Sequence, residues 1–265
     1  MKALPRSAAH ARFIRSLKRK DAAVRIAQIL LLVLLFGVWE LGARLGWFDA
    51  FILSSPSRVW QTIVGLYRAG DLWVHIGTTL LETVLGFVLG TLFGVLLAVL
   101  LWWLPVVNRV LDPYLVVLNA LPKIALGPVL IVWIGAGMAS IVVMGILVSL
   151  VVTTVTVLNG FMATTDEKQL LMRTLGANKW QIFSKVVLPA SVPDLISALK
   201  ISVGMSWVGV IVGEYLVSKA GLGYLIVYGG QVFKLDLVMA SVVILCVLAA
   251  GMYYAVALLE ARIRR

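Results

Sequence analysis

Residues Thr78–Leu104 read TTLLETVLGFVLGTLFGVLLAVLLWWL, an apolar run in which Glu82 is the only charged residue. An α-helix needs about 20 predominantly apolar residues to cross the hydrocarbon core of a bilayer. This run meets that requirement and therefore predicts a membrane-spanning helix.

The composition of the whole chain points the same way. Of 265 residues, 62% are hydrophobic and 13% are charged, and the mean hydropathy is +1.03. An ordinary soluble domain is about half apolar and about a quarter charged. The composition therefore excludes a soluble enzyme, a nucleic-acid-binding domain and a disordered chain, and it indicates an integral membrane protein.

Six apolar runs are long enough to span a bilayer. Because a helix satisfies its own backbone hydrogen bonds in lipid, we expect all of them to be helical. The sequence thus predicts an all-α integral membrane protein with about six transmembrane helices. The runs are Ile26–Leu45, Thr78–Leu104, Tyr114–Ile134, Ala139–Leu158, Val192–Gly213 and Leu237–Leu259.

The basic residues are distributed unevenly between the two sides that six spans define. Many lie before Ile26, where only Asp21 opposes them, and more lie in Asp166–Lys185 and at the C-terminal end. The positive-inside rule then predicts that both termini are cytoplasmic, whereas five spans would place the C-terminal arginines outside. We divide the chain into a basic cytoplasmic segment, 1–25, and a transmembrane domain, 26–265. Since the basic segment runs directly into an apolar one, we expect it to contact membrane lipid and not nucleic acid.

Residues Pro56–Ala69 form a run too short to span, with Val59, Ile63 and Leu66 at helical spacing and a proline at the expected first turn. We interpret it as an interfacial helix on the outer face. It could pack against the bundle or contact an external partner.

Small residues at four-residue spacing line one face of two predicted spans. Gly86, Gly90 and Gly94 form such a face in the second span, as do Gly209 and Gly213 in the fifth. Faces of this kind allow another helix backbone to approach closely. They predict where helices pack.

The third span is interrupted, because Pro122, Lys123 and Pro128 fall within its apolar run. Irregular backbone at membrane depth is tolerated where it is buried in protein or lines a wet cavity. Pro122 and Lys123 are therefore candidates for a translocation pathway, unless Lys123 only extends to the cytoplasmic interface. Glu82 is a second candidate with the same two interpretations.

The predicted cytoplasmic loop, about 161–190, has its own helical pattern. Asp166–Leu175 predicts a short helix with Thr165 as its cap, and Gly176 ends it. Asn178–Lys185 predicts a second helix that ends before Pro189, with Trp180 among its periodic apolar residues. Such a loop could dock a soluble partner or lie on the lipid surface.

This loop resembles the signature of the permease subunits of bacterial ABC importers, E-A-A-x3-G-x9-I-x-L-P. Gly176, Leu188 and Pro189 stand at the correct spacing, Val186 replaces the isoleucine, and Leu170-Leu171-Met172 replace the acidic-alanine triplet. The segments Ser54–Val59, Leu121–Pro128 with Trp133–Gly137, and Glu214 followed by Gly221–Tyr224 resemble the nitrate/sulfonate/taurine branch of these binding-protein-dependent transporters.

The resemblance implies a function. Two permease chains, expected to be a homodimer, would form the pathway in the bacterial inner membrane for a small anionic or polar solute. Such solutes are nitrate, sulfonates, taurine, or pyrimidine and vitamin precursors. Separate ATPase subunits would dock inside and a substrate-binding protein outside. The residues expected to dock the ATPase are Gly176, Ala177, Trp180, Leu188 and Pro189; those expected to line the pathway are Pro122, Lys123, Ser206, Glu214 and Glu82.

The chain lacks the motifs of an enzyme. It has no G-x4-G-K-[ST] phosphate loop, so we expect ATP hydrolysis to reside in another subunit. His10, His75 and the single Cys246 make no ligand cluster, and we expect no catalytic residue, metal or cofactor. The alternatives are an ion-coupled secondary transporter that works without an ATPase, and a membrane scaffold, for which intramembrane charges are costly.

Overall fold

The computed structural model describes residues 8–263, without the side chains of 8–18, 21, 166 and 263, and within this range the regular structure is entirely helical. Of the predicted basic segment, residues 1–7 lie outside the described residues, and the backbone of the remainder belongs to the first helix. The helices and turns are α1 (Ala8–Arg44), α2 (Ala50–Leu53), α3 (Pro56–Ala69), α4 (Asp71–Trp103), α5 (Pro105–Ala120), η1 (Lys123–Leu126), α6 (Gly127–Ile134), α7 (Met138–Met162), α8 (Asp166–Thr174), α9 (Lys179–Ile182), η2 (Phe183–Val187), α10 (Leu188–Ala190), α11 (Val192–Val217), α12 (Leu222–Gln231) and α13 (Leu235–Ile263).

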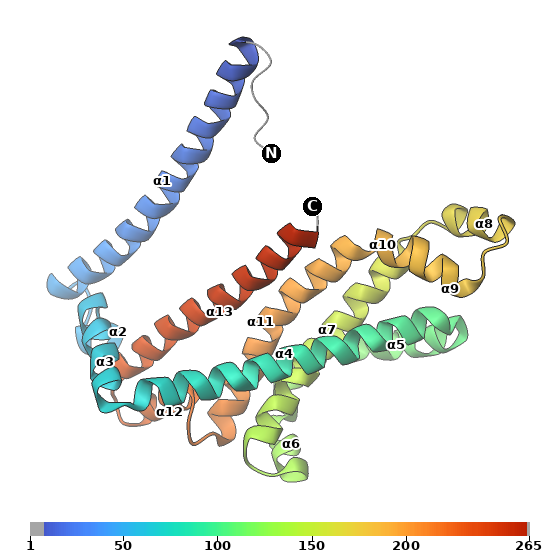
Figure 1. The fold of residues 1–265 in the computed structure, drawn as a ribbon. Coiled ribbons are helices and arrows are strands. Elements are labelled where there is room, and N and C mark those ends of the chain that lie inside the picture. Colours follow the sequence, from blue (N-terminus) through green and yellow to red (C-terminus); the bar gives the residue numbers. More distant parts are fainter. Residues whose placement is uncertain (1–7, 264–265) are drawn as a thin grey trace.

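Five helices are long and apolar enough to cross a membrane, and a bent pair makes a sixth span if it is counted as one. The five are Ala22–Arg44 of α1, then α4, α7, α11 and Leu235–Arg262 of α13. The elements α8–α10 lie at one end of these helices, and α3, α6 and α12 lie toward the other (Figure 1). The prediction of an all-helical membrane protein is confirmed.

The predicted break in the third span is present. α5 ends at Ala120, and the chain bends by 86° before it continues from Lys123 to Ile134. The amino group of Lys123 donates a hydrogen bond to the carbonyl of Asn119, at 3.1 Å, so this cation caps the end of α5. The helix also begins earlier than predicted, at Pro105 in place of Tyr114, because a proline is well suited to a first turn.

The centre of the molecule is the packing of α4 and α11 on α7, and glycine makes it close. A Cβ atom added to Gly209 would lie 2.7 Å from the Cα of Gly145, and one added to Gly86 would lie 3.4 Å from that same atom. A Cβ on Gly90 would meet the Ser149 hydroxyl. The glycine faces predicted on the second and fifth spans therefore both contact α7, as small-residue faces in membranes do.

The loop after α7 folds into an elbow, which we define as α8, the turn at Gly176, and α9 with η2 and α10. Gly176 has a φ of +80°, a conformation that costs other residues steric strain. Asn178 and Gln181 form a capping box that starts α9.

The prediction that the second helix ends before Pro189 is wrong, because Pro189 lies inside α10. Proline lacks a backbone donor, and its ring clashes with the carbonyl four residues earlier in an α-helix. The π-helical turn of η2, Phe183–Val187, widens the backbone just before Pro189, and the helix therefore continues.

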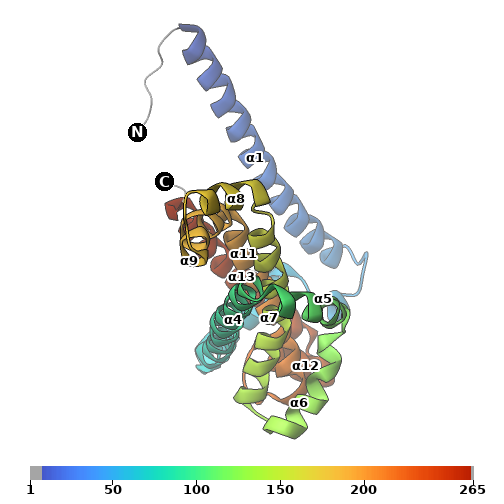
Figure 2. The ribbon, with the colours of Figure 1, turned by 90° about the vertical axis from the view of Figure 1, so that its right-hand side faces the viewer.

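The first three helices lie at the side of the bundle. α1 stands apart along most of its length and packs on α2 and α3 near its C-terminal end (Figure 2). α3 matches the predicted short helix at both ends, with Ser55 as its N-cap and Pro56 in its first turn. Val59 is buried, so this helix packs against the bundle, which was one of the two roles predicted for it.

Candidate functional site

The elbow exposes four large apolar residues among its polar ones. Leu170, Leu171, Leu175 and Trp180 are 61%, 61%, 74% and 62% exposed. Aliphatic and aromatic groups gathered on an exposed loop are a mark of an interaction surface. Of these four residues, the sequence predicted only Trp180 to dock a partner. The adjacent leucines Leu170 and Leu171 in the short, polar helix α8 were a signal that could have identified more of this surface.

The predicted docking residues occupy different parts of this elbow. Gly176 is exposed at its tip, and a Cβ atom there would meet nothing within 4 Å. Ala177 is half-buried against the core beneath. Leu188 and Pro189 are exposed in α10, at the base of the elbow. The space beside Gly176 at the tip is therefore open, whereas Ala177 belongs to the attachment.

The inner side of the elbow is held by aromatic rings at the end of α4. The ring of Phe183 lies 4.9 Å from that of Trp102 and 5.4 Å from that of Phe161, measured between centroids. Phe161, Ile182, Phe183 and Val187 are buried in one apolar cluster with Trp102. η2 is thus part of the core.

A lysine adds a polar contact at the same place. The amino group of Lys179 lies 5.7 Å from the ring centroid of Trp102 and 5.4 Å from that of Trp103. It also donates a hydrogen bond of 2.5 Å to the Trp103 carbonyl. Helix C-termini carry unpaired carbonyls and a partial negative charge, which favour a cation. Lys179 therefore caps α4 while it contacts two indole faces.

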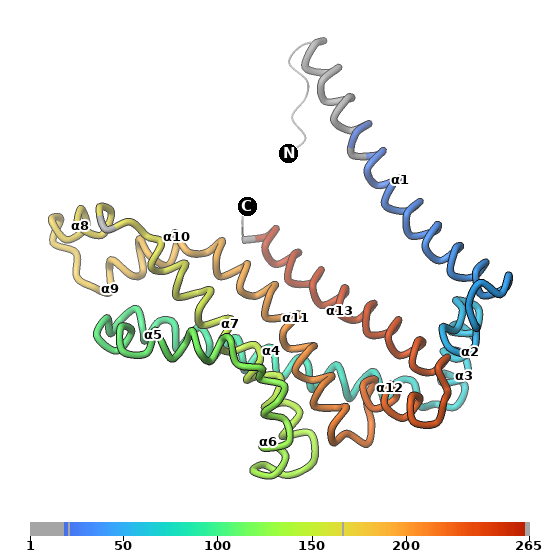
Figure 3. Tube along the Cα trace, turned by 180° about the vertical axis from the view of Figure 1, so that it is seen from behind, coloured from blue at the N-terminus to red at the C-terminus, as the bar shows by residue number. Residues whose placement is uncertain are grey.

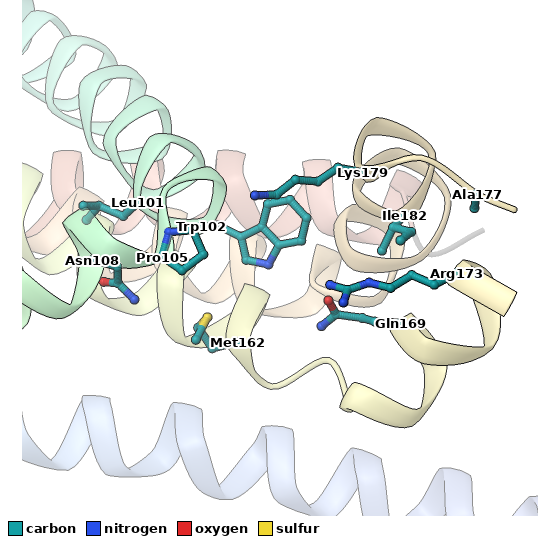
Figure 4. A pocket seen from close by; sticks show the side chains of 10 residues that line it. All are labelled: Leu101, Trp102, Pro105, Asn108, Met162, Gln169, Arg173, Ala177, Lys179 and Ile182. Atoms are coloured by element: carbon teal, nitrogen blue, oxygen red, sulfur yellow. The ribbon is translucent and has the colours of Figure 1, made fainter.

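A cavity of about 500 Å³ separates α8 from the corner between α4 and α5. Arg173 and Gln169 extend into it from α8, Trp102 and Asn108 lie on the opposite side, and Lys179 is at its edge (Figure 4). The α9 arm of the elbow therefore contacts α4 through Lys179, whereas Gln169 and Arg173 of the α8 arm face this cavity.

At the other end of the molecule, side chains from two other helices cap α12. The N–H groups of Gly221 and Leu222 donate to His75 Nδ1 at 3.0 Å and to Thr79 Oγ1 at 2.7 Å. Those of Gly223 and Tyr224 donate to Glu214 Oε2 at 2.6 and 3.4 Å. The first N–H groups of a helix have no partner within it. Here α4 and α11 provide every acceptor, and Gly221 itself makes no side-chain cap.

Glu214 and Glu82, two predicted pathway residues, are brought together at this cap. Each is 1% exposed, and the two carboxyl groups are close enough to interact electrostatically. One oxygen of each has no partner among the described residues. We define these two residues, with His75 and Thr79, as the α12 cap.

The other predicted pathway residues are elsewhere. Ser206 is fully buried in α11, and its hydroxyl has no partner in the part of the chain that the structure describes. Pro122 and Lys123 belong to the break between α5 and α6. A single chain does not gather these residues into one site. Nor do residues 8–263 bring three metal-ligating side chains together.

Comparison with known protein families gives a clear match. The model of a family described as "Binding-protein-dependent transport system inner membrane component" matches residues 90–265. A probable ABC transporter permease protein of Haemophilus influenzae is 36% identical over 234 residues, which cover 88% of this chain and 95% of that protein. The riboflavin transport system permease protein RibX of Chloroflexus aurantiacus is 32% identical, with 93% and 92% covered. A putative aliphatic sulfonates transport permease protein of Bacillus subtilis is 27% identical, with 83% and 79% covered.

Solved structures share the fold. A chain of a bacterial ABC transporter involved in the import of the acidic polysaccharide alginate superposes with a TM-score of 0.65 at 16% identity. The match covers 96% of this chain and all of that one. A chain from an inward-facing structure of the MetNI methionine ABC transporter superposes with a TM-score of 0.63 at 20% identity, covering 80% of this chain.

Proposed function

The chain belongs to the family of inner membrane components of binding-protein-dependent transport systems, and from that premise we propose how its two ends serve an importer. It is a multi-pass membrane protein and a permease subunit of the ABC importer type, for a small solute. The family match supports this function and not the ion-coupled carrier.

The elbow is the docking element for the separate ATPase. The observation that carries this assignment is the set of exposed apolar residues Leu170, Leu171, Leu175 and Trp180 on the two sides of the Gly176 turn. Apolar anchors of this kind form the centre of protein interfaces when a partner groove covers them. The elbow then lies in the cytoplasm, in agreement with the basic residues of this loop and with cytoplasmic termini.

The opposite end, with α3, α6 and α12, faces the external substrate-binding protein. A second copy of the chain completes the pathway in the bacterial inner membrane. The scattered positions of Lys123, Ser206 and Glu214 within one chain support a pathway that needs a second subunit.

For the solute, we favour a vitamin or vitamin precursor over an alkanesulfonate. The relative named for riboflavin transport is 32% identical and the one named for aliphatic sulfonates is 27% identical. Mass spectrometry of small molecules released from the copurified binding protein tests this assignment. A sulfonate in that fraction would overturn it.

The docking assignment is tested by Gly176→Asp and by Trp180→Ala, in complexes purified from membranes. The surroundings of Gly176 are open and Asp enters positive φ more readily than most residues, so the backbone strain from Asp is small. We expect Gly176→Asp to lower substrate-stimulated ATP hydrolysis several-fold, with a melting temperature within a few degrees of the parent. Trp180→Ala should weaken retention of the ATPase on the permease.

The matched control is Trp133→Ala. Trp133 is 78% exposed in α6, far from the elbow, and its removal should leave ATPase retention unchanged. Full retention and full stimulation in both elbow variants would contradict docking at this surface.

A further inference from the structure

The cavity between α8 and the corner of α4 and α5 is separate from the exposed apolar residues of the elbow, none of which lines it. It lies at the end of the molecule where α8 and α9 are beside the end of α4 and the start of α5 (Figure 3). Because α4 is long enough to cross the membrane and ends at Trp103, this corner falls at a membrane–water interface. Tryptophans are enriched at that depth, and Trp102 and Trp103 are the last two residues of α4.

The walls of this cavity carry positive charge. Arg173 extends into it from α8, Lys179 lies at its edge, and no Asp or Glu is among the described residues that line it. The guanidinium group of Arg173 makes no ion pair with a described side chain. Lys179 uses one of its three N–H donors on the carbonyl of Trp103, which leaves two for a ligand. Two cations with available donors in one cavity favour an anion.

Other groups of the wall match the remainder of a lipid molecule. The Oδ1 atom of Asn108 is buried and has no hydrogen-bond partner in the part of the chain that the structure describes, so a hydroxyl group of a ligand would satisfy it. Trp102, Pro105 and Met162 form an apolar part of the wall (Figure 4). Val106, next to Pro105, is exposed on α5, so apolar surface for an acyl chain continues outside the cavity.

We propose that this cavity binds the head group of an anionic phospholipid, whose phosphate contacts Arg173 and Lys179 and whose head-group hydroxyl donates to Asn108. Basic pockets between membrane helices bind anionic head groups. A lipid gains from the apolar wall and from the exposed surface of α5, whereas a free anion would gain from the two cations alone. The bound head group would join α8 and α9 to α5, and this binding does not depend on the ATPase.

The test is native mass spectrometry of the complete transporter, purified in detergent and stripped of loosely held lipid. The probe is phosphatidylglycerol, which combines one negative charge with hydroxyl groups in its head group. Phosphatidylcholine with the same acyl chains is the uncharged comparison. We expect one tightly held phosphatidylglycerol for each copy of the chain, with an affinity roughly tenfold above that of phosphatidylcholine, because two basic residues contact its phosphate.

Three substitutions locate the binding in the cavity. Arg173→Gln removes the charge from an exposed side chain, and it should lower the affinity for phosphatidylglycerol about fivefold while that for phosphatidylcholine stays unchanged. Arg173→Lys keeps the charge and should retain most of the affinity. Lys168→Gln is the matched control, because it removes an exposed cation of the same helix that does not line the cavity. It should bind phosphatidylglycerol as the parent does.

Equal losses in Arg173→Gln and Lys168→Gln would overturn the cavity site, because the lipid would then respond to the charge of α8 as a whole. Displacement of the lipid by inorganic phosphate at constant ionic strength would overturn the lipid and assign the cavity to a free anion. Release of the lipid when the ATPase binds would also overturn it, because the partner would then fill the cavity. Selective retention by a permease that copurifies with no ATPase would support the lipid site and contradict only the proposed function.

Discussion

The elbow and the α12 cap attach two short helical segments to the same long helix by different means. At the elbow, an exposed lysine contacts a helix end and two indole rings above an aromatic cluster. At the α12 cap, two α4 side chains and Glu214 accept the N–H groups of Gly221 to Tyr224 in the interior. The comparison shows that the Lys179 contact is exposed and that the contacts of the α12 cap are buried or half-buried.

The free-energy difference between the two attachments follows from burial. A buried N–H group that loses its acceptor costs about 1–3 kcal/mol, because water does not replace the bond. An exposed cation–ring contact is worth about 0.5–1 kcal/mol. The hydrogen bonds of the α12 cap should therefore contribute more to stability than the contacts of Lys179 do.

The largest effect is expected for Glu214→Ala. It removes the acceptor of the Gly223 and Tyr224 N–H groups from a site that is 1% exposed. We expect a loss of about 3 kcal/mol from unpaired donors and the space left by the side chain. The measurement is the melting temperature of the purified protein in detergent.

Glu82→Gln is the matched control for that substitution, since it changes the neighbouring buried carboxyl group and keeps the Glu214 acceptor of the Gly223 and Tyr224 N–H groups. Its melting temperature should equal or exceed that of the parent. If Glu214→Ala proves as stable as the parent, the α12 cap has no structural role.

Gly221→Ala should have a smaller effect at the same place. Gly221 has a φ of +116°, and an added Cβ would lie 2.4 Å from Glu214 Oε2. Backbone strain of this kind costs about 1–3 kcal/mol, and the carboxylate must also move. The melting temperature should fall by several degrees.

Gly204→Ala provides the comparison, because it lies in a helix and its added Cβ would meet nothing within 4 Å. It should be neutral or slightly stabilising, since alanine favours a helix by up to about 1 kcal/mol. Equal losses in the two variants would show that the close approach to Glu214 is unimportant.

The smallest effect on stability is expected for Lys179→Met. The exposed amino group contributes under about 1 kcal/mol, and Met keeps much of the apolar contact with the rings. The melting temperature should change by at most a few degrees. A loss of stability as large as that of Glu214→Ala would remove the distinction between an exposed attachment and a largely buried one.

Local features of the sequence predicted much of this arrangement. Pro56 precedes an apolar-periodic run and predicted the first turn of a helix, and α3 begins there. The glycine spacing of Gly86 and Gly90 predicted a packing face, and it meets α7. Pro122 predicted the break after α5. Each of these features depends on neighbours within a few residues.

The sequence did not predict that the helix continues through Pro189. A proline usually ends a helix, and no local residue pattern indicated the π-helical turn of η2 that accommodates this one. The partner of Lys179 was also not predictable, since Trp103 precedes it by 76 residues. The same holds for His75 and Thr79, which accept bonds from residues 146 and 143 positions later. The sequence thus provided candidate docking residues in the elbow, and it did not predict the contacts that hold α9 and α12 on α4.

The sequence by itself determined the class of protein, the helical spans and the loop that resembles a known docking element. Hydropathy and helix capping depend on residue type and short spacing, which a chain displays before it folds. Only the tertiary structure decided that Glu214 caps a short helix, that Lys179 caps α4, and that one helix connects them. Unpaired backbone groups at helix ends accept whichever suitable side chain the packing of other helices brings near, and nothing in the local sequence specifies which one that is.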